Sequence, residues 1–178
     1  MCEISSLQLK ISDLSAKLIS LCEKKQITFG TAESCTGGLI SAAITGIPGA
    51  SAVFWGGVVS YDNRIKNRIL GVKNNTLQTF GAVSAQTAKE MARGAVKILG
   101  TTLAVSVTGI AGPGGGTPQK PVGLVYLAVA TNSGQILCRK CEFQGDRAQI
   151  RLQTVAAALD LLIFAVENIG NSESFDTE

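Results

Sequence analysis

The sequence contains no histidine among its 178 residues. Ser-His-Asp and Cys-His catalytic arrangements and most catalytic zinc sites depend on an imidazole, so the composition excludes them. Any catalytic chemistry in this chain must therefore use a different base.

Long hydrophobic runs and charge of one sign are also missing. No run reaches the roughly 18 apolar residues that span a bilayer, and the N-terminal segment "MCEISSLQLKISDLSAKLIS" carries internal charges and lacks the features of a signal peptide. The net charge is only +3 and the basic residues are scattered, which gives no footprint for a nucleic acid. We therefore expect a cytoplasmic protein that binds neither membranes nor nucleic acids.

Cysteine occurs in an odd number, five, and widely spread, so a disulfide framework is not expected. Cys138 and Cys141 form a C-x-x-C, but residues three apart in a strand face opposite sides, and no second pair exists to complete a zinc site. Cys35 has no histidine to form its thiolate and is a weak candidate nucleophile.

Apolar residues make up 46% of the chain, which indicates a packed globule. The length predicts one domain over residues 1–178, with a flexible tail from about residue 168. Hydrophobic periodicity and capping residues predict strands at 27–33, 52–61, 103–109, 123–131 and 135–143, and helices at about 5–24, 36–45, 63–70, 84–99 and 146–167. We therefore expect a three-layer α/β/α domain with a mixed, mostly parallel sheet of about five strands.

The stretch "TAESCTGGLI" places Ser34 where a strand ends and a helix begins. Ligands of open α/β sheets bind outside the carboxyl ends of strands. The amides of Cys35, Thr36 and Gly37 are expected to point outward there and could hold a phosphate or stabilise an oxyanion. The alternative is that Ser34 only caps the helix.

The helix predicted over "NRIKNRIL" places Lys66 inside the apolar arc formed by Ile65, Ile69 and Leu70. Lysine is rarely buried without a partner, and burial together with a nearby cation would lower its pKa. A neutral Lys66 is a candidate base for Ser34, because Ser-Lys pairs act as catalytic pairs in proteins without a catalytic histidine. Tyr61, at the end of the preceding strand, could relay or position the proton. The alternative is a Lys66 that extends to solvent.

The segment "VTGIAGPGGGTPQKPVG" follows a strand but lacks the ending of a Walker loop, and no helix follows it. Its length and its glycines favour a binding role over a long turn. Arg147 lies in the first turn of the last predicted helix, where a cation opposes the helix dipole unless an anion lies nearby. The alternative for Arg147 is an ordinary exposed side chain.

Together, "TAESCTGGLI", "GGVVSYDNRIKNRILGV", "VSAQTAKEMARGA", "AVSVTGIAGPGGGTPQKPVGLVYLAVA" and "FQGDRAQIR" resemble the CinA C-terminal domain family. Active members of that family hydrolyse nicotinamide mononucleotide to nicotinate mononucleotide and ammonia. The resemblance implies an α/β/α fold, a small nucleotide as substrate, no metal or organic cofactor, a homodimer, and a stand-alone form without the N-terminal domain that many relatives carry. It leaves open a non-catalytic nucleotide-binding module linked to competence or DNA damage.

The resemblance also assigns site residues. It implies Ser34 as nucleophile, Lys66 as its base and Tyr61 as an assisting residue. The positions that it implies for substrate contact are Thr36, Gly37, Gly38, Thr108, Gly109, Gly112, Gly114, Gly115 and Arg147.

Overall fold

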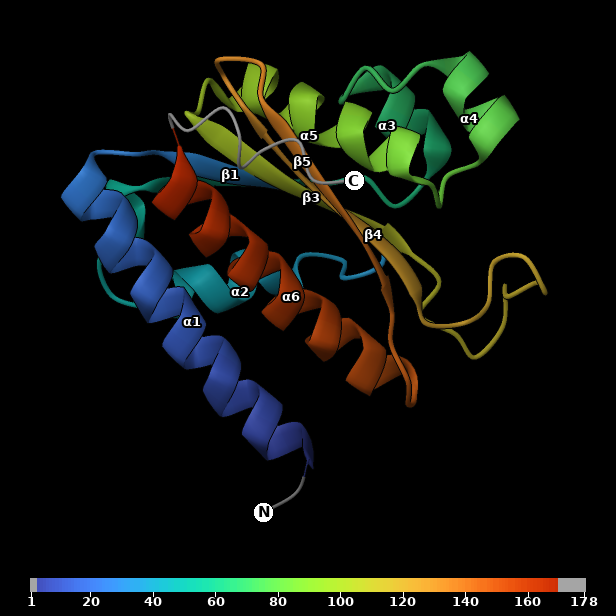
Figure 1. Cartoon of the computed structure of the whole chain (residues 1–178), viewed down its shortest axis with the longest axis horizontal. Coiled ribbons are helices and arrows are strands. Elements are labelled where there is room, and N and C mark those ends of the chain that lie inside the picture. The colour runs from blue at the N-terminus through green and yellow to red at the C-terminus, as the bar shows by residue number, and fades with distance from the viewer. Residues whose placement is uncertain (1–2, 170–178) are drawn as a thin grey trace.

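The structure is a computed structural model that describes residues 3–169. A five-stranded sheet in the order β2-β1-β3-β4-β5 lies between two layers of helices (Figure 1). The strands are β1 Phe29–Glu33, β2 Phe54–Val59, β3 Leu103–Gly109, β4 Leu124–Thr131 and β5 Ile136–Glu142. β1 is parallel to β2 and β3, whereas β4 is antiparallel to both β3 and β5, so only β4 runs in the reverse direction. The predicted three-layer domain with a mixed sheet is confirmed.

The helices divide between the two faces of the sheet (Figure 1). One layer contains α1 Glu3–Lys25, α2 Leu39–Thr45 and α6 Arg147–Asn168, and the other contains α3 Asn63–Arg68, α4 Asn74–Phe80 and α5 Ala85–Leu99. A short 3-10 helix, Ala50–Ala52, precedes β2. α6 and α5 pack directly on the central strands, and α1 packs on α6.

A hydrophobic cluster fills the space on each face of the sheet. β3 is buried almost throughout, because helices cover both faces of the sheet, and its two polar side chains, Ser106 and Thr108, donate to the backbone carbonyls of Ala88 and Ala82. Cys138 packs against the cluster under α5 and Cys141 against the cluster under α6. The prediction that these two cysteines face opposite sides is confirmed.

The predicted helix caps are present. Asp62 accepts a hydrogen bond from the amide of Arg64 and begins α3, and Ser84 accepts from the amide of Thr87 and begins α5. Asp146 opens α6 with a reciprocal capping box. These caps fix the points at which three of the covering helices begin.

Three local predictions are wrong. α2 begins at Leu39 rather than at residue 36 or 37, because Gly37 and Gly38 both have positive φ and form a turn. α4 was not predicted, since its sequence "NNTLQTF" is mostly polar and carries little helical periodicity. Ile65 and Ile69 do not form a buried arc, because they are 37% and 40% exposed.

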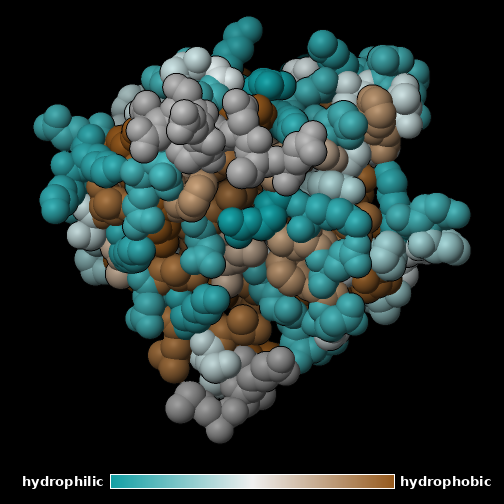
Figure 2. All heavy atoms as spheres, viewed as in Figure 1, coloured by the Kyte–Doolittle hydropathy of each residue, from teal (hydrophilic) through white to brown (hydrophobic). Residues whose placement is uncertain are grey.

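α6 is the one described helix that is long and apolar enough to cross a membrane by length and composition. Its most apolar window is 61% buried within the protein, against β3, β4 and α1, which is typical of a core helix. Hydrophilic and hydrophobic side chains are interspersed over the molecular face that Figure 2 shows. The predicted tail from about residue 168 lies almost wholly outside the described residues.

Candidate active site

Two parallel strands bring Ser34 and Lys66 to the same edge of the sheet. Ser34 follows β1, and its amide extends the ladder to β3 by donating to Val107 O at 3.1 Å. β2 lies beside β1, and Ser60, just past its end, donates its amide to Glu33 O at 2.7 Å. α3, which carries Lys66, begins three residues after Ser60, so both side chains start from the carboxyl ends of adjacent strands.

Lys66 Nζ lies 3.0 Å from Ser34 Oγ in the interior of the protein. The amine also donates to Ser60 O at 2.7 Å and to Tyr61 O at 3.0 Å. A neutral amine has two N–H donors and one lone pair. The protonated amine donates to all three oxygens, whereas in the neutral form the two carbonyls take both donors and leave the lone pair for the hydroxyl proton of Ser34.

Burial controls the charge of this amine. Lys66 is 1% exposed, and desolvation lowers its pKa from the usual 10.5, while the negative forms of Cys35 and Asp62 act in the opposite direction. The predicted neighbouring cation is not among the causes, so desolvation alone favours the neutral base.

The local fold explains why Lys66 points inward. Asp62 fixes the start of α3, and the chain after this short helix folds back so that Val72 donates its amide to Lys66 O at 3.1 Å. Leu70 and Val72 are buried against α5 and take the apolar contacts that Ile65 and Ile69 do not make. The inward direction of Lys66 was correctly predicted, although the apolar arc used to predict it was not.

A pocket of about 190 Å³ opens beside the Ser34–Lys66 pair. Its wall combines the ends of β1 and β3, the start of α3, the segment before α5 and the start of α6. The lining residues are Ser34, Cys35, Tyr61, Asn63, Lys66, Ala82, Val83, Thr108, Gly109, Ala111 and Arg147. Six of the predicted site residues therefore meet at one pocket: Ser34, Tyr61, Lys66, Thr108, Gly109 and Arg147.

Arg147 joins two walls of this pocket. Its guanidinium donates to Gly112 O at 2.7 Å and to the Tyr61 hydroxyl at 3.3 Å. The Tyr61 side chain is 63% exposed, and it is the backbone carbonyl of this residue that holds Lys66. The Tyr61 hydroxyl thus contacts Arg147 rather than the Ser34–Lys66 pair.

The glycine-rich loop contributes only its first part to the pocket. Thr108 donates its hydroxyl to Ala82 O at 2.8 Å and joins β3 to the segment before α5. A side chain at Gly109 would collide with Val125, so β4 requires the glycine there. Gly114 and Gly115, like Gly112, do not line the pocket, although the Gly112 carbonyl accepts from Arg147.

Thr36, Gly37 and Gly38 lie in the turn after Ser34 and do not line the pocket. Gly37 donates its amide to Ser34 O at 3.1 Å, so this amide is not free for an oxyanion. The amide of Gly38 and the hydroxyl of Thr36 bond to the Glu33 carboxylate. The hydrogen bonds of these residues therefore stabilise the turn itself.

Sequence reasoning missed several residues of the site. Asn63, Ala82, Val83 and Ala111 line the pocket, and only Asn63 had a usable signal, because it lies between Tyr61 and Lys66 in the chain. Glu33 was missed as well, although an acidic residue that ends a buried strand immediately before a turn of small residues is a signal in itself.

Cys35 lines the pocket beside Ser34 but is a poor nucleophile. Burial raises the pKa of its thiol to about 11, against the lowering effect of the amides of Cys35 and Thr36 and the charge of Arg151. The cysteines also form no metal centre, since residues 3–169 contain no cluster of three or more Cys, Asp or Glu able to hold an ion.

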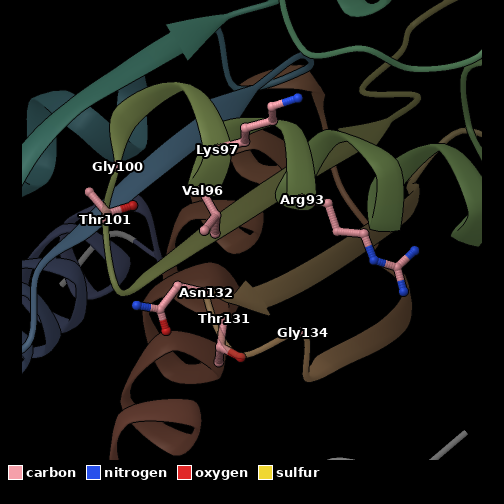
Figure 3. A pocket seen from close by; sticks show the side chains of 8 residues that line it. All are labelled: Arg93, Val96, Lys97, Gly100, Thr101, Thr131, Asn132 and Gly134. Carbon is pink, nitrogen blue, oxygen red and sulfur yellow. The ribbon is translucent and has the colours of Figure 1, made fainter.

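A second pocket, larger at about 420 Å³, lies at the opposite end of the strands. It is formed by the end of α5 and the turn between β4 and β5 (Figure 3). Its two cations do not converge, because Lys97 points away from Thr131 and Asn132 while Arg93 extends from an earlier turn of α5. Its lining contains no paired nucleophile and base, so we assign the chemistry to the smaller pocket.

The fold and the site define the class: a three-layer α/β/α domain with a pocket at the carboxyl ends of its parallel strands. Within that class the chain belongs to the CinA C-terminal domain family, whose profile matches residues 11–166. The family that the sequence motifs suggested is thereby confirmed.

Individual relatives agree with this assignment. The chain is 54% identical over 139 residues to a CinA-like protein of Leptospira borgpetersenii serovar Hardjo-bovis (strain L550), covering 78% of this chain and 33% of that protein. A crystal structure of the competence/damage inducible protein CihA from Agrobacterium tumefaciens matches with a TM-score of 0.86 and 47% identity, over 89% of this chain and 96% of that one. A CinA superfamily protein from Klebsiella pneumoniae matches with a TM-score of 0.85 and 30% identity, over 89% and 98% of the two chains. The chain thus spans about a third of the length of the curated relative.

Proposed function

We propose that this protein is an amidohydrolase that converts nicotinamide mononucleotide to nicotinate mononucleotide and ammonia. The observation that carries the proposal is the buried contact of 3.0 Å between Lys66 Nζ and Ser34 Oγ, with the amine held by two backbone carbonyls. A nucleotide-binding domain without turnover has no need of a buried amine beside a hydroxyl. The choice of nicotinamide mononucleotide as the substrate is based on the resemblance to active members of the family.

The reaction begins when neutral Lys66 accepts the hydroxyl proton of Ser34. Ser34 Oγ then bonds to the carboxamide carbon, and the carbonyl oxygen takes the negative charge. Protonated Lys66 donates its proton to the amide nitrogen, the carbon–nitrogen bond breaks and ammonia leaves. Water then attacks the acyl-enzyme, with Lys66 accepting its proton and returning it to Ser34.

The oxyanion needs donors near Ser34. Because the amides of Gly37 and Gly38 are committed to Ser34 O and Glu33, we assign this role to the amides of Cys35 and Thr36. We assign the nucleotide phosphate to Arg147, the guanidinium at the wall of the pocket. No metal or organic cofactor enters these steps, and we place the activity in the cytoplasm and in a homodimer.

An ammonia-release assay with nicotinamide mononucleotide tests the proposal. We expect Ser34→Ala and Lys66→Ala each to lose at least about 1,000-fold in kcat, as other serine nucleophiles and their bases do. The exposed residues Ser51 and Lys97 provide the matched controls Ser51→Ala and Lys97→Ala, which should keep wild-type activity. Full activity in Ser34→Ala would refute the assignment of the nucleophile.

The name of one solved relative, the competence/damage inducible protein CihA from Agrobacterium tumefaciens, supports a second candidate, a nucleotide-binding regulatory module connected with competence or damage responses. The same experiment separates the two. A wild-type protein that binds nicotinamide mononucleotide in calorimetry but releases no ammonia would favour the regulatory module.

A further inference from the structure

Glu33 is a buried carboxylate immediately before Ser34, and it contacts no cation in an ion pair within the described chain. It is 1% exposed. Oε2 accepts from the hydroxyl of Thr36 at 2.7 Å and from the amides of Gly38 and Ile40 at 2.9 and 3.1 Å. Oε1 accepts from the amide and the hydroxyl of Ser41, both at 2.8 Å. A sixth, longer bond of 3.5 Å reaches Oε1 from the Thr31 hydroxyl on β1 itself. A buried charge is tolerated only when hydrogen bonds replace its hydration, and here the five shorter bonds are the main ones that do so.

The donors of these five shorter bonds all belong to the turn and helix that follow Ser34. Gly38, the N-cap residue just before α2, has no side chain to cap the helix, so the carboxylate from β1 takes that place. The backbone carbonyl of Glu33 also accepts the amide of Ser60, whose own carbonyl holds Lys66. One residue thereby connects the turn that carries Ser34 to the strand end that orients Lys66.

Arg151 holds the same turn from the side of α6. Its guanidinium donates to Cys35 O at 3.2 Å and to Thr36 O at 2.6 Å. The turn is therefore fixed by a carboxylate that accepts from its amides and hydroxyl and by a guanidinium that donates to its carbonyls. A short turn tied on both sides has little freedom to move Ser34 away from its base.

We propose that Glu33 is a positioning residue for Ser34: its carboxylate holds the 34–38 turn so that the serine hydroxyl faces Lys66. The role rests on the proposed function, in which Ser34 is the nucleophile. Glu33 does not line the pocket and both of its oxygens are occupied, so it has no access to substrate. It acts through Ser34 and not on the reacting atoms.

The test compares Glu33→Gln with Glu90→Gln. The glutamine side chain has the same shape but only one acceptor oxygen, so the donors that faced the other oxygen meet an NH₂ group instead. Glu90 is a matched control, because its carboxylate also holds the start of a helix and lies away from the pocket. It accepts hydrogen bonds from Lys73 N and Thr76 Oγ1 at the start of α4, both at 2.8 Å. We measure kcat, KM, thermal midpoint and the crystal structure of each variant.

We expect Glu33→Gln to lose about 100-fold in kcat, the effect of displacing a reacting group by about 1 Å, with KM within about twofold of wild type. Glu90→Gln should lose a similar amount of thermal stability and keep its kcat. Thr36→Val, which removes one donor to the carboxylate, should also lower kcat without raising KM. A rise in KM in that variant would assign Thr36 to substrate contact and count against the proposal.

The crystal structure separates this inference from the proposed function. In Glu33→Gln the distance between Ser34 Oγ and Lys66 Nζ should lengthen by about 1 Å even if the wild type releases no ammonia. An unchanged distance of 3.0 Å in Glu33→Gln would overturn the positioning role. A loss of kcat in Glu90→Gln equal to that in Glu33→Gln would overturn it as well, because the effect would then be general destabilisation.

Discussion

Lys66 Nζ and Ser34 Oγ lie 3.0 Å apart although 32 residues separate them in the chain. The contact depends on the parallel pairing of β1 and β2, which aligns the ends of the two strands, and on the cap that starts α3 directly after β2. An amine with a depressed pKa is therefore built into the junction of a strand and a short helix.

Lys66 makes stability and activity depend on pH. Its pKa is lowered by burial in the folded state, whereas the unfolded chain has the usual value of 10.5. Between the lowered value and 10.5 the unfolded state binds more protons, so the free energy of unfolding rises with pH across this window. We expect kcat/KM to rise with pH through the lower end of the same window, because only neutral Lys66 is a base.

The measurement is urea unfolding of wild type and Lys66→Met between neutral pH and pH 10. The difference in unfolding free energy between the two proteins should change with pH, since Met carries no titrating group. Parallel stability curves for both proteins would show that the Lys66 pKa is the same in the folded and unfolded states.

Tyr61→Phe separates the hydroxyl of this residue from its backbone. The substitution removes the contact of 3.3 Å with Arg147 and leaves the carbonyl that holds Lys66. We therefore expect a higher KM for nicotinamide mononucleotide with kcat close to wild type, because Arg147 loses an orienting partner. A fall in kcat with unchanged KM would instead support a proton relay through the hydroxyl, and steady-state kinetics distinguish the two.

Cys35 should resist alkylation in the folded protein. With its pKa at about 11, only about one thiol in a thousand is ionised at pH 8, and its side chain is almost fully buried. Iodoacetamide labelling, followed by peptide mass spectrometry, should be much slower at Cys35 in native protein than in urea. Rapid labelling of native Cys35 at neutral pH would make this residue a candidate nucleophile again.

Much of the fold followed from local sequence signals. The caps at Asp62, Ser84 and Asp146 and the strand over residues 103–109 each depend on neighbouring residues, and each was predicted correctly. The start of α2 was misjudged because it depends on Glu33, whose carboxylate reaches amides up to eight residues along the chain. Local pattern does not reveal such a contact.

The site shows the same division. Ser34 and Lys66 were singled out from their own surroundings, a strand end and a lysine among apolar residues, and the resemblance supplied the roles proposed for them. Ala82 and Val83 were not found, because bonds from distant residues, Thr108 to Ala82 O and Lys120 to Val83 O, hold that segment at the pocket. Contacts between segments far apart in the chain decide which ordinary residues become pocket walls.

Substitution of Gly94 tests how closely α5 packs against the segment that follows α3. In an exposed helix, replacing glycine with alanine stabilises by about 1 kcal/mol. Here a Cβ at Gly94 would overlap the carbonyl group of Leu70, which lies two residues after the end of α3. Because a backbone carbonyl cannot move aside as a flexible side chain can, we expect Gly94→Ala to destabilise by about 1–3 kcal/mol.

Thermal unfolding measures this effect, and a loss of 1 kcal/mol lowers the midpoint by about 2–4 °C in a domain of this size. Gly114→Ala is the control for stability, since a Cβ there meets nothing within 4 Å and the midpoint should stay unchanged. Because Leu70 lies four residues after Lys66, the displaced segment should also weaken the hold on the amine, and kcat of folded Gly94→Ala should fall. A midpoint equal to or above that of the wild type would show that α5 and α3 are not packed as closely as the structure has them.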